Sequence, residues 1–185
     1  KLAKLHAVLG EHPKVVELLE PHENLEGVLR NEIRLELGTA LCRQHWRAPD
    51  SDPYRRGYDL IAGVVAELEQ PQGAVVLNFR RRESLRARAL SRLGWVCEVD
   101  VTRTAEAGKR HREALELEPA NPYYLANVLG FELQGGAIAE DVVRCLRPAM
   151  LDAVRASESH AAQGMELPFA FFTAGRLRLL LGQSD

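Results

Sequence analysis

The feature that most constrains the fold is a four-residue recurrence of apolar side chains, interrupted by prolines and glycines. From Glu83 onward, Leu85, Ala89, Leu93 and Cys97 follow one another at steps of four. This spacing places side chains on one face of an α-helix, whereas a half-buried strand alternates with a period of two. We therefore expect amphipathic helices that each bury one face.

The apolar stripes fall into pairs, and each pair predicts an antiparallel helical hairpin. The breaks between stripes include the helix-ending residues Pro71, Pro119 and Gly182. The expected hairpins span 24–71, 83–119, 121–162 and, incompletely, 167–185. The segment 73–79 has the composition of a short strand, but one strand cannot make a sheet, so we expect a linker or a helix start there. Pro148 is expected to kink or divide the returning helix of the third hairpin.

Length and composition fit one all-α domain over residues 1–185. The 185 residues are 46% hydrophobic and 27% charged, which suffices for one globular domain or a short repeat array. With a formal net charge of -2, the chain does not have the strongly basic character of most nucleic-acid-binding proteins. No apolar run approaches a membrane span, and the first residues are no signal peptide. We expect a cytoplasmic protein without membrane contact and, since the first residue is not Met, a fragment of a larger one.

Small residues recur at positions where two helices would cross. Gly94, Ala107 and Ala114, followed by Pro119, match the tetratricopeptide repeat family, which this chain resembles; Gly175 is a further small residue of this kind. The resemblance is good over 85–122, partial over 122–162 and 167–182, and weak before Pro71. It implies hairpins stacked as an α-α superhelix, a solenoid in which small residues let neighbouring helices approach closely. An unrelated helical-hairpin solenoid is the alternative.

The resemblance also implies a concave groove, lined by the first helix of each hairpin, that binds a protein or peptide. The groove residues chosen by helical spacing are Arg88, Ser91, Arg92, Trp95, Tyr123, Ala126, Asn127, Phe172 and Arg176. Arginine and aromatic residues often contribute much of the binding energy of an interface. Arg92 and Arg176 would then bind acidic or carboxylate groups. In the alternative interpretation, Trp95 and Phe172 only pack between neighbouring units.

One segment is strongly basic. Residues 79–92 contain six arginines and one glutamate; the arginines are Arg80, Arg81, Arg82, Arg86, Arg88 and Arg92. A guanidinium surface facing away from the apolar stripe would suit phosphates or an acidic peptide. The alternative is a solvated helix face whose arginines pair with Glu113, Glu116 and Glu118. The near absence of aromatic residues from the segment favours this second interpretation over nucleic-acid binding.

The chain carries no recognisable catalytic or cofactor motif, so we expect no enzyme activity, no cofactor and no metal. Cys42 and His45 share a helix face, but a buried cysteine beside a helix-end histidine is the favoured interpretation. His111 is expected in the core, as are Cys97 and Cys145. An enzyme with its site in the concave face is the least favoured hypothesis.

These observations predict a non-enzymatic protein-binding or peptide-binding scaffold, a regulatory or assembly module of a larger cytoplasmic protein. Its partner would be another protein or other domains of the same parent chain, and nucleic acid is not expected. The alternative function is a sensor or adaptor for a phosphorylated ligand, a nucleotide or nucleic acid, acting through the Arg80–Arg92 surface.

Overall fold

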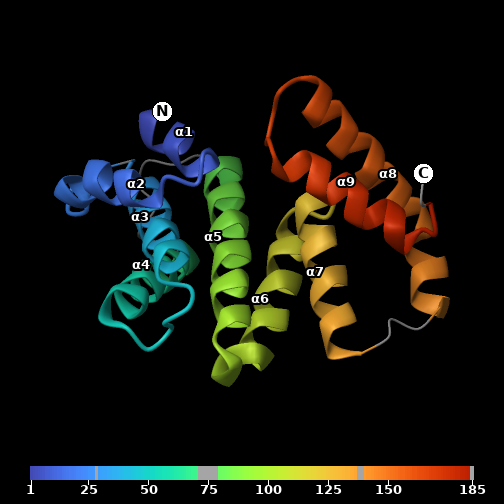
Figure 1. Ribbon diagram of the computed structural model, residues 1–185, viewed down its shortest axis with the longest axis horizontal. Helices are drawn as coiled ribbons and strands as arrows, with labels where there is room; N and C mark the ends of the chain where they lie inside the picture. Colours follow the sequence, from blue (N-terminus) through green and yellow to red (C-terminus); the bar gives the residue numbers. More distant parts are fainter. Residues whose placement is uncertain (28, 71–78, 137–139, 184–185) are drawn as a thin grey trace. The chain divides into compact units, whose positions relative to one another are not determined.

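The computed structural model describes residues 1–27, 29–70, 79–136 and 140–183, and over these residues all regular structure is helical (Figure 1). The α-helices are α1 (Leu2–Val8), α2 (His12–Leu19), α3 (Arg30–Gln44), α4 (Asp52–Glu69), α5 (Phe79–Val99), α6 (Thr104–Leu117), α7 (Pro122–Gly135), α8 (Glu140–Ala162) and α9 (Phe169–Leu180). Two short 3-10 helices are η1 (Glu20–His22) and η2 (Val101–Arg103). The expected all-α class is confirmed for the described part of the chain.

The chain divides into two compact units. Unit 1 comprises Lys1–Arg110 and unit 2 comprises His111–Asp185, so the division falls within α6. The single domain 1–185 and the stacking of all hairpins into one superhelix therefore stay predictions.

In unit 1, α3 and α4 pack against each other through one glycine on each helix. A β-carbon on Gly38 would lie 2.7 Å from the carbonyl oxygen of Gly57. A β-carbon on Gly57 would lie 2.7 Å from the carbonyl oxygen of Gly38 and 2.7 Å from Cys42 Sγ. Helices approach this closely only where the crossing residues are small, so these two glycines determine the spacing of the hairpin.

The core of unit 1 extends from this hairpin to α5, which packs on α4. Ile61 and Val64 of α4 and Leu90 of α5 are fully buried. The phenol of Tyr54 is also inside, where its O–H donates to the carbonyl oxygen of Val96 at 2.8 Å. This bond satisfies the one polar atom that burial of the tyrosine would otherwise leave without a partner.

Unit 2 has its own core, built by α7, α8 and α9. The buried residues of this cluster are Leu125, Ala126, Leu129, Met150, Ala153, Val154, Leu177 and Leu181. Helix α7 begins at Pro122 because the side chain of Asn121 accepts a hydrogen bond from Tyr123 N at 3.0 Å, which caps the helix. Helix α8 continues through Pro148, so the proline does not divide it, and the alternative expectation of a kink there stays a prediction. The apolar face after the proline is held in the core by α9.

The largest error of the sequence analysis concerns the first hairpin. A helix was expected from residue 24, but α3 begins at Arg30, and Leu25 and Leu29 are about half exposed. Gly27 adopts φ +99°, a left-handed conformation that interrupts a helix. Helices α1 and α2 were not expected from the sequence, although Val15 of α2 is fully buried. The segment 73–78, interpreted as a linker or helix start, lies outside the described residues.

Candidate functional site

The arginines of α5 are engaged mainly with the first hairpin. Three ion pairs join them to α3 and α4: Arg81–Glu32 at 2.9 Å, Arg86–Glu69 at 3.3 Å and Arg92–Glu36 at 3.9 Å. The apolar stripe of α5, with Leu85, Ala89 and Leu93, is buried as expected. The use of these arginines as a binding surface for phosphates or an acidic peptide stays a prediction. The expected pairing with Glu113, Glu116 and Glu118 stays a prediction.

Arg82 donates hydrogen bonds to backbone carbonyl groups at the end of α4. Its Nε donates to the carbonyl oxygen of Leu68 at 2.9 Å, and its Nη2 donates to the carbonyl oxygens of Leu68 at 2.6 Å and Gln70 at 2.9 Å. The last carbonyls of a helix have no partner within the helix, and cationic side chains often bind them. Arg82 thus caps α4. Of the basic segment, Arg80 is exposed and Arg88 is half-buried with its Nε inside.

The groove residues expected on α5 lie partly inside unit 1. Trp95 is half-buried, with the guanidinium carbon of Arg43 at 5.5 Å from its ring centroid. Burial, together with the nearby Arg92, lowers the pKa of Arg43 to about 10. Burial and the charges of Arg43 and Arg92 also lower the pKa of His12. Ser91 is half-buried as well. This cationic cluster is internal to unit 1, between α2, α3 and α5.

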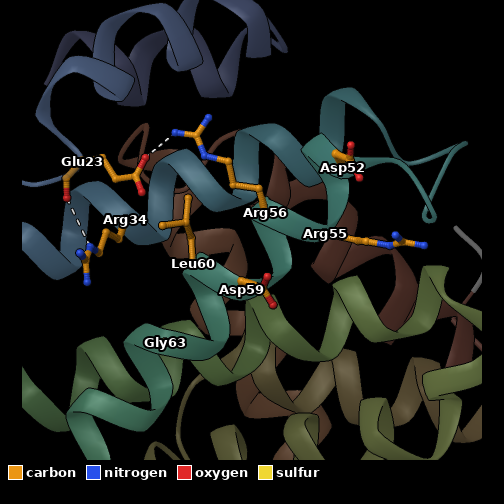
Figure 2. A pocket seen from close by; sticks show the side chains of 8 residues that line it. All are labelled: Glu23, Arg34, Asp52, Arg55, Arg56, Asp59, Leu60 and Gly63. Atoms are coloured by element: carbon orange, nitrogen blue, oxygen red, sulfur yellow. Dashed lines mark hydrogen bonds and ion pairs between the residues drawn. The ribbon is translucent and has the colours of Figure 1, made fainter.

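An open pocket of about 450 Å³ lies beside α3 and α4 (Figure 2). Arg56 pairs there with Glu20 and Glu23, and Arg34 Nε donates to the Glu23 carbonyl oxygen at 3.3 Å. Asp52, Arg55 and Asp59 also line this pocket. Arg56 and Arg34 thus bind the segment that precedes α3, so we assign this pocket a structural role.

A second polar hollow, of about 310 Å³, lies between α4 and the end of α5. The guanidinium carbon of Arg103 lies 4.0 Å from the ring centroid of Tyr58, and its Nε donates to Asp100 at 3.1 Å. The cation is thus already bound by an aromatic face and a carboxylate of the same unit. This arrangement anchors η2.

Cys42 and His45 lie near the end of α3, and the surroundings of the Cys42 thiol disfavour its reactive form. Cys42 is buried and its Sγ donates to the carbonyl oxygen of Tyr54 at 3.6 Å. Burial, with a smaller effect of Cys97, raises the pKa of the Cys42 thiol to about 12, so the reactive thiolate is not formed at neutral pH. His45 is half-buried at the end of α3. Cys97 is buried as expected, whereas the expectation for Cys145 is wrong because this residue is exposed.

His111 is almost fully buried, as expected, with its ring centroid 6.2 Å from that of Phe131. Among the described residues there is no group of three or more histidine, cysteine, aspartate or glutamate side chains that could hold a metal ion.

Of the groove residues expected in unit 2, some contact other side chains of the unit and others are exposed. Tyr123 is stacked on His160 with 5.8 Å between ring centroids, and its hydroxyl lies 2.8 Å from His160 Nδ1. Burial, and to a smaller extent Glu166, raises the pKa of Tyr123 to about 12. Asn127 is half-buried. Ala126 is 3% exposed and belongs to the core, so it was wrongly placed in a groove.

Among the described residues of unit 2, the most exposed large apolar side chains lie on helix α9. Phe171 is 62% exposed, Phe172 70% and Leu179 71%. Gly175 lies among them, and a β-carbon there would meet no atom within 4 Å. Gly175 is therefore not the packing position that the repeat resemblance implied. We call Phe171, Phe172, Gly175 and Leu179 the α9 strip.

Two adjoining hollows lie along the α9 strip, between α8 and α9. The larger, of about 540 Å³, is lined by Phe171, Gly175 and Leu179, and the smaller, of about 290 Å³, by alanines of both helices. Both share Phe171, Ala174 and Glu158. Hollows lined by apolar atoms and bordered by charges are typical of sites that receive side chains of a partner.

Sequence reasoning selected Phe172 and Arg176 for the groove and assigned Gly175 to helix packing, but it did not select Phe171 and Leu179. The available signal was the composition of α9. Apart from Arg176 and Arg178 the helix is mostly apolar, so it carries more apolar side chains than one buried face needs. Only the structure distinguishes its buried face, with Ala170, Ala174 and Leu177, from its exposed one.

No family model matches the chain, and no curated protein or solved structure is significantly similar to it. None of the described helices combines the length and the apolar character that crossing a membrane requires. The candidate site therefore depends on the geometry of the chain alone, and the α9 strip is the strongest candidate.

Proposed function

We propose that the chain is a non-catalytic, tetratricopeptide-like module of helical hairpins that binds a protein or peptide on the α9 strip. Its proposed setting is the cytoplasm, and its proposed role is that of a regulatory or assembly scaffold. The antiparallel packing of α3 with α4 and of α8 with α9 supports the hairpin architecture. The close crossing at Gly38 and Gly57 supports it further, because repeats of this type need small residues at helix crossings.

The observation that carries the binding proposal is the exposure of the α9 strip beside two hollows. Aromatic and leucine side chains exposed together cost free energy in water, and large contiguous apolar patches on a folded chain are often interaction sites. The hollows between α8 and α9 provide the concave sites into which partner side chains fit.

The alternative function, recognition of phosphate through the Arg80–Arg92 surface, has less support. Arg81, Arg86 and Arg92 pair with carboxylates, and Arg82 caps α4. An anion would have to displace these internal contacts. Phosphate recognition is therefore the less favoured of the two functions.

The test is a selection of peptides from a random display library against the immobilised chain, followed by affinity measurement on two variants. Gly175→Leu fills the larger hollow, and Gly63→Leu is the matched control because Gly63 is also an exposed helix glycine with open space around it. Both changes replace a helix glycine by a better helix former. We expect selected peptides to bind wild type and Gly63→Leu equally, and Gly175→Leu about tenfold or more weakly.

The proposal fails if the library yields no binder, or if Gly175→Leu binds the selected peptides as tightly as wild type does. Circular dichroism of both variants establishes that loss of binding is not loss of fold.

A further inference from the structure

One arginine borders the α9 strip on each side, and the two differ in their ion pairing. Arg178, on the α8 side, forms an ion pair with Glu158. Arg176, on the opposite border, is exposed, and within the described residues no carboxylate pairs with it. The strip is therefore apolar in the middle and has on one side a cation that forms no ion pair with the described carboxylates.

The guanidinium group of Arg176 lies against α7, and no carboxylate of the described residues pairs with it. A β-carbon on Gly130 of α7 would lie 2.5 to 2.8 Å from the atoms of its guanidinium group, so this group rests on the glycine backbone of α7. Gly130 is buried, and any side chain there would displace the arginine. A cation positioned in this way loses less conformational freedom when it binds an anion.

The spacing along α9 indicates the form of the partner. Phe172, Arg176 and Leu179 follow one another at steps of four and three, so they form one line on the helix surface. The complementary line on a second helix has two apolar side chains about two turns apart with a carboxylate between them. A second copy of this chain fits poorly, because it would bring another Arg176 to the same place.

We propose that the α9 strip binds an acidic amphipathic helix, with its apolar side chains on the strip and a carboxylate on Arg176. This inference rests on the proposed function, since it names the class of partner for the same surface. The apolar contacts provide affinity, and the ion pair selects acidic segments over neutral or basic ones.

The probes are three 18-residue helical peptides that share leucines seven positions apart and differ only in the intervening residue, which is glutamate, glutamine or lysine. Their affinities for the chain are measured by fluorescence anisotropy at low and at high salt. We expect the glutamate peptide to bind about two to five times more tightly than the glutamine peptide, as for an ion pair at the edge of an interface. The lysine peptide should bind most weakly, and the differences should shrink at high salt.

Charge reversal tests the residue itself. Arg176→Glu should invert the order, so that the lysine peptide binds most tightly. Arg80→Glu is the control, because Arg80 is an exposed arginine of unit 1 and lies outside the strip. With this variant the original order should be kept.

The outcomes separate this inference from the proposed function. If all three peptides bind equally and Gly175→Leu weakens them all, the strip binds helices without selecting acidic ones, and the inference is wrong while the proposed function stands. If Gly175→Leu weakens none of them, both are wrong. Sedimentation that shows a dimer of the chain, abolished by Gly175→Leu, would assign the strip to a second copy and overturn the inference.

Discussion

At the scale of residues, arginines of unit 1 serve as internal connectors. Arg82 binds the carbonyl oxygens of Leu68 and Gln70, and Arg56 joins α4 to Glu20 and Glu23. The sequence identified the basic segment but not its partners, because helical spacing tells which side chains share a face and not which helix that face meets. Partners such as Glu32 and Arg81, 49 positions apart, depend on the packing of α3 with α5.

A pH dependence of stability follows from His12. Burial and the charges of Arg43 and Arg92 lower its pKa in the folded state below the ordinary value of 6.5. The unfolded chain therefore binds more protons near and below pH 6.5, so the free energy of unfolding falls as the pH falls through that range. We expect wild type to lose more stability than His12→Gln between pH 7.5 and pH 5.5, measured by urea unfolding.

The carboxylates with lowered pKa values do not obscure this comparison. Glu11, Glu32 and Asp100 lose their contributions only as the pH falls below about 4.5, the range in which unfolded carboxylates protonate. Equal loss of stability in wild type and His12→Gln would show that the histidine is not shielded in the fold.

At the scale of elements, the α3–α4 hairpin depends on its two crossing glycines. In Gly57→Ala the new methyl group would meet the backbone of Gly38 at 2.7 Å, and backbone cannot move aside as a flexible side chain can. We expect a loss of about 1–3 kcal/mol in the free energy of unfolding, as for other overpacked sites. Thermal and denaturant unfolding measure the change.

The matched control lies on the same helix. Gly63→Ala places its methyl group in open space, so it should stabilise the chain by about 0.5–1 kcal/mol through helix propensity alone. Similar effects of the two substitutions would contradict the close crossing of α3 and α4.

The accuracy of the sequence analysis at this scale depended on the length of the periodic pattern. The third hairpin was predicted well, since α7 and α8 span 122–135 and 140–162. The short helices α1 and α2 were missed because a few residues give too weak a periodicity. In the segment before Arg30, the apolar spacing was helical but Gly27 interrupts the helix.

At the scale of the whole molecule, each unit has its own core. Leu177 is fully buried in the cluster formed by α7, α8 and α9. We expect Leu177→Ala to lower the stability of unit 2 by about 2–5 kcal/mol, as for other leucines removed from a core. Hydrogen exchange should then accelerate in α7, α8 and α9 while α3 and α4 keep their protection.

Uniform acceleration in both units would instead mean that the chain unfolds as one cooperative body. That result would favour the single domain expected from the length of the chain.

The candidate site shows what periodicity cannot provide. Phe172 and Arg176 were selected because they share a helix face, which helical geometry alone determines. The openness around Gly175 and the hollows beside it arise from how α8 packs on α9. Glycines lie both at a close crossing, as Gly38 and Gly57 do, and on an open helix face, as Gly175 does, so a glycine in the sequence does not distinguish the two settings.

The most direct test of the central claim is an amide NMR titration of the isotope-labelled chain with a selected peptide. If the α9 strip is the binding surface, the largest shift changes will occur at Phe171, Phe172, Gly175 and Leu179 and at the facing part of α8, and those of α3, α4 and α5 will be small. Shift changes concentrated on α5, at Arg80 to Arg92, with α9 unaffected, would contradict the claim and restore the basic segment as the binding surface.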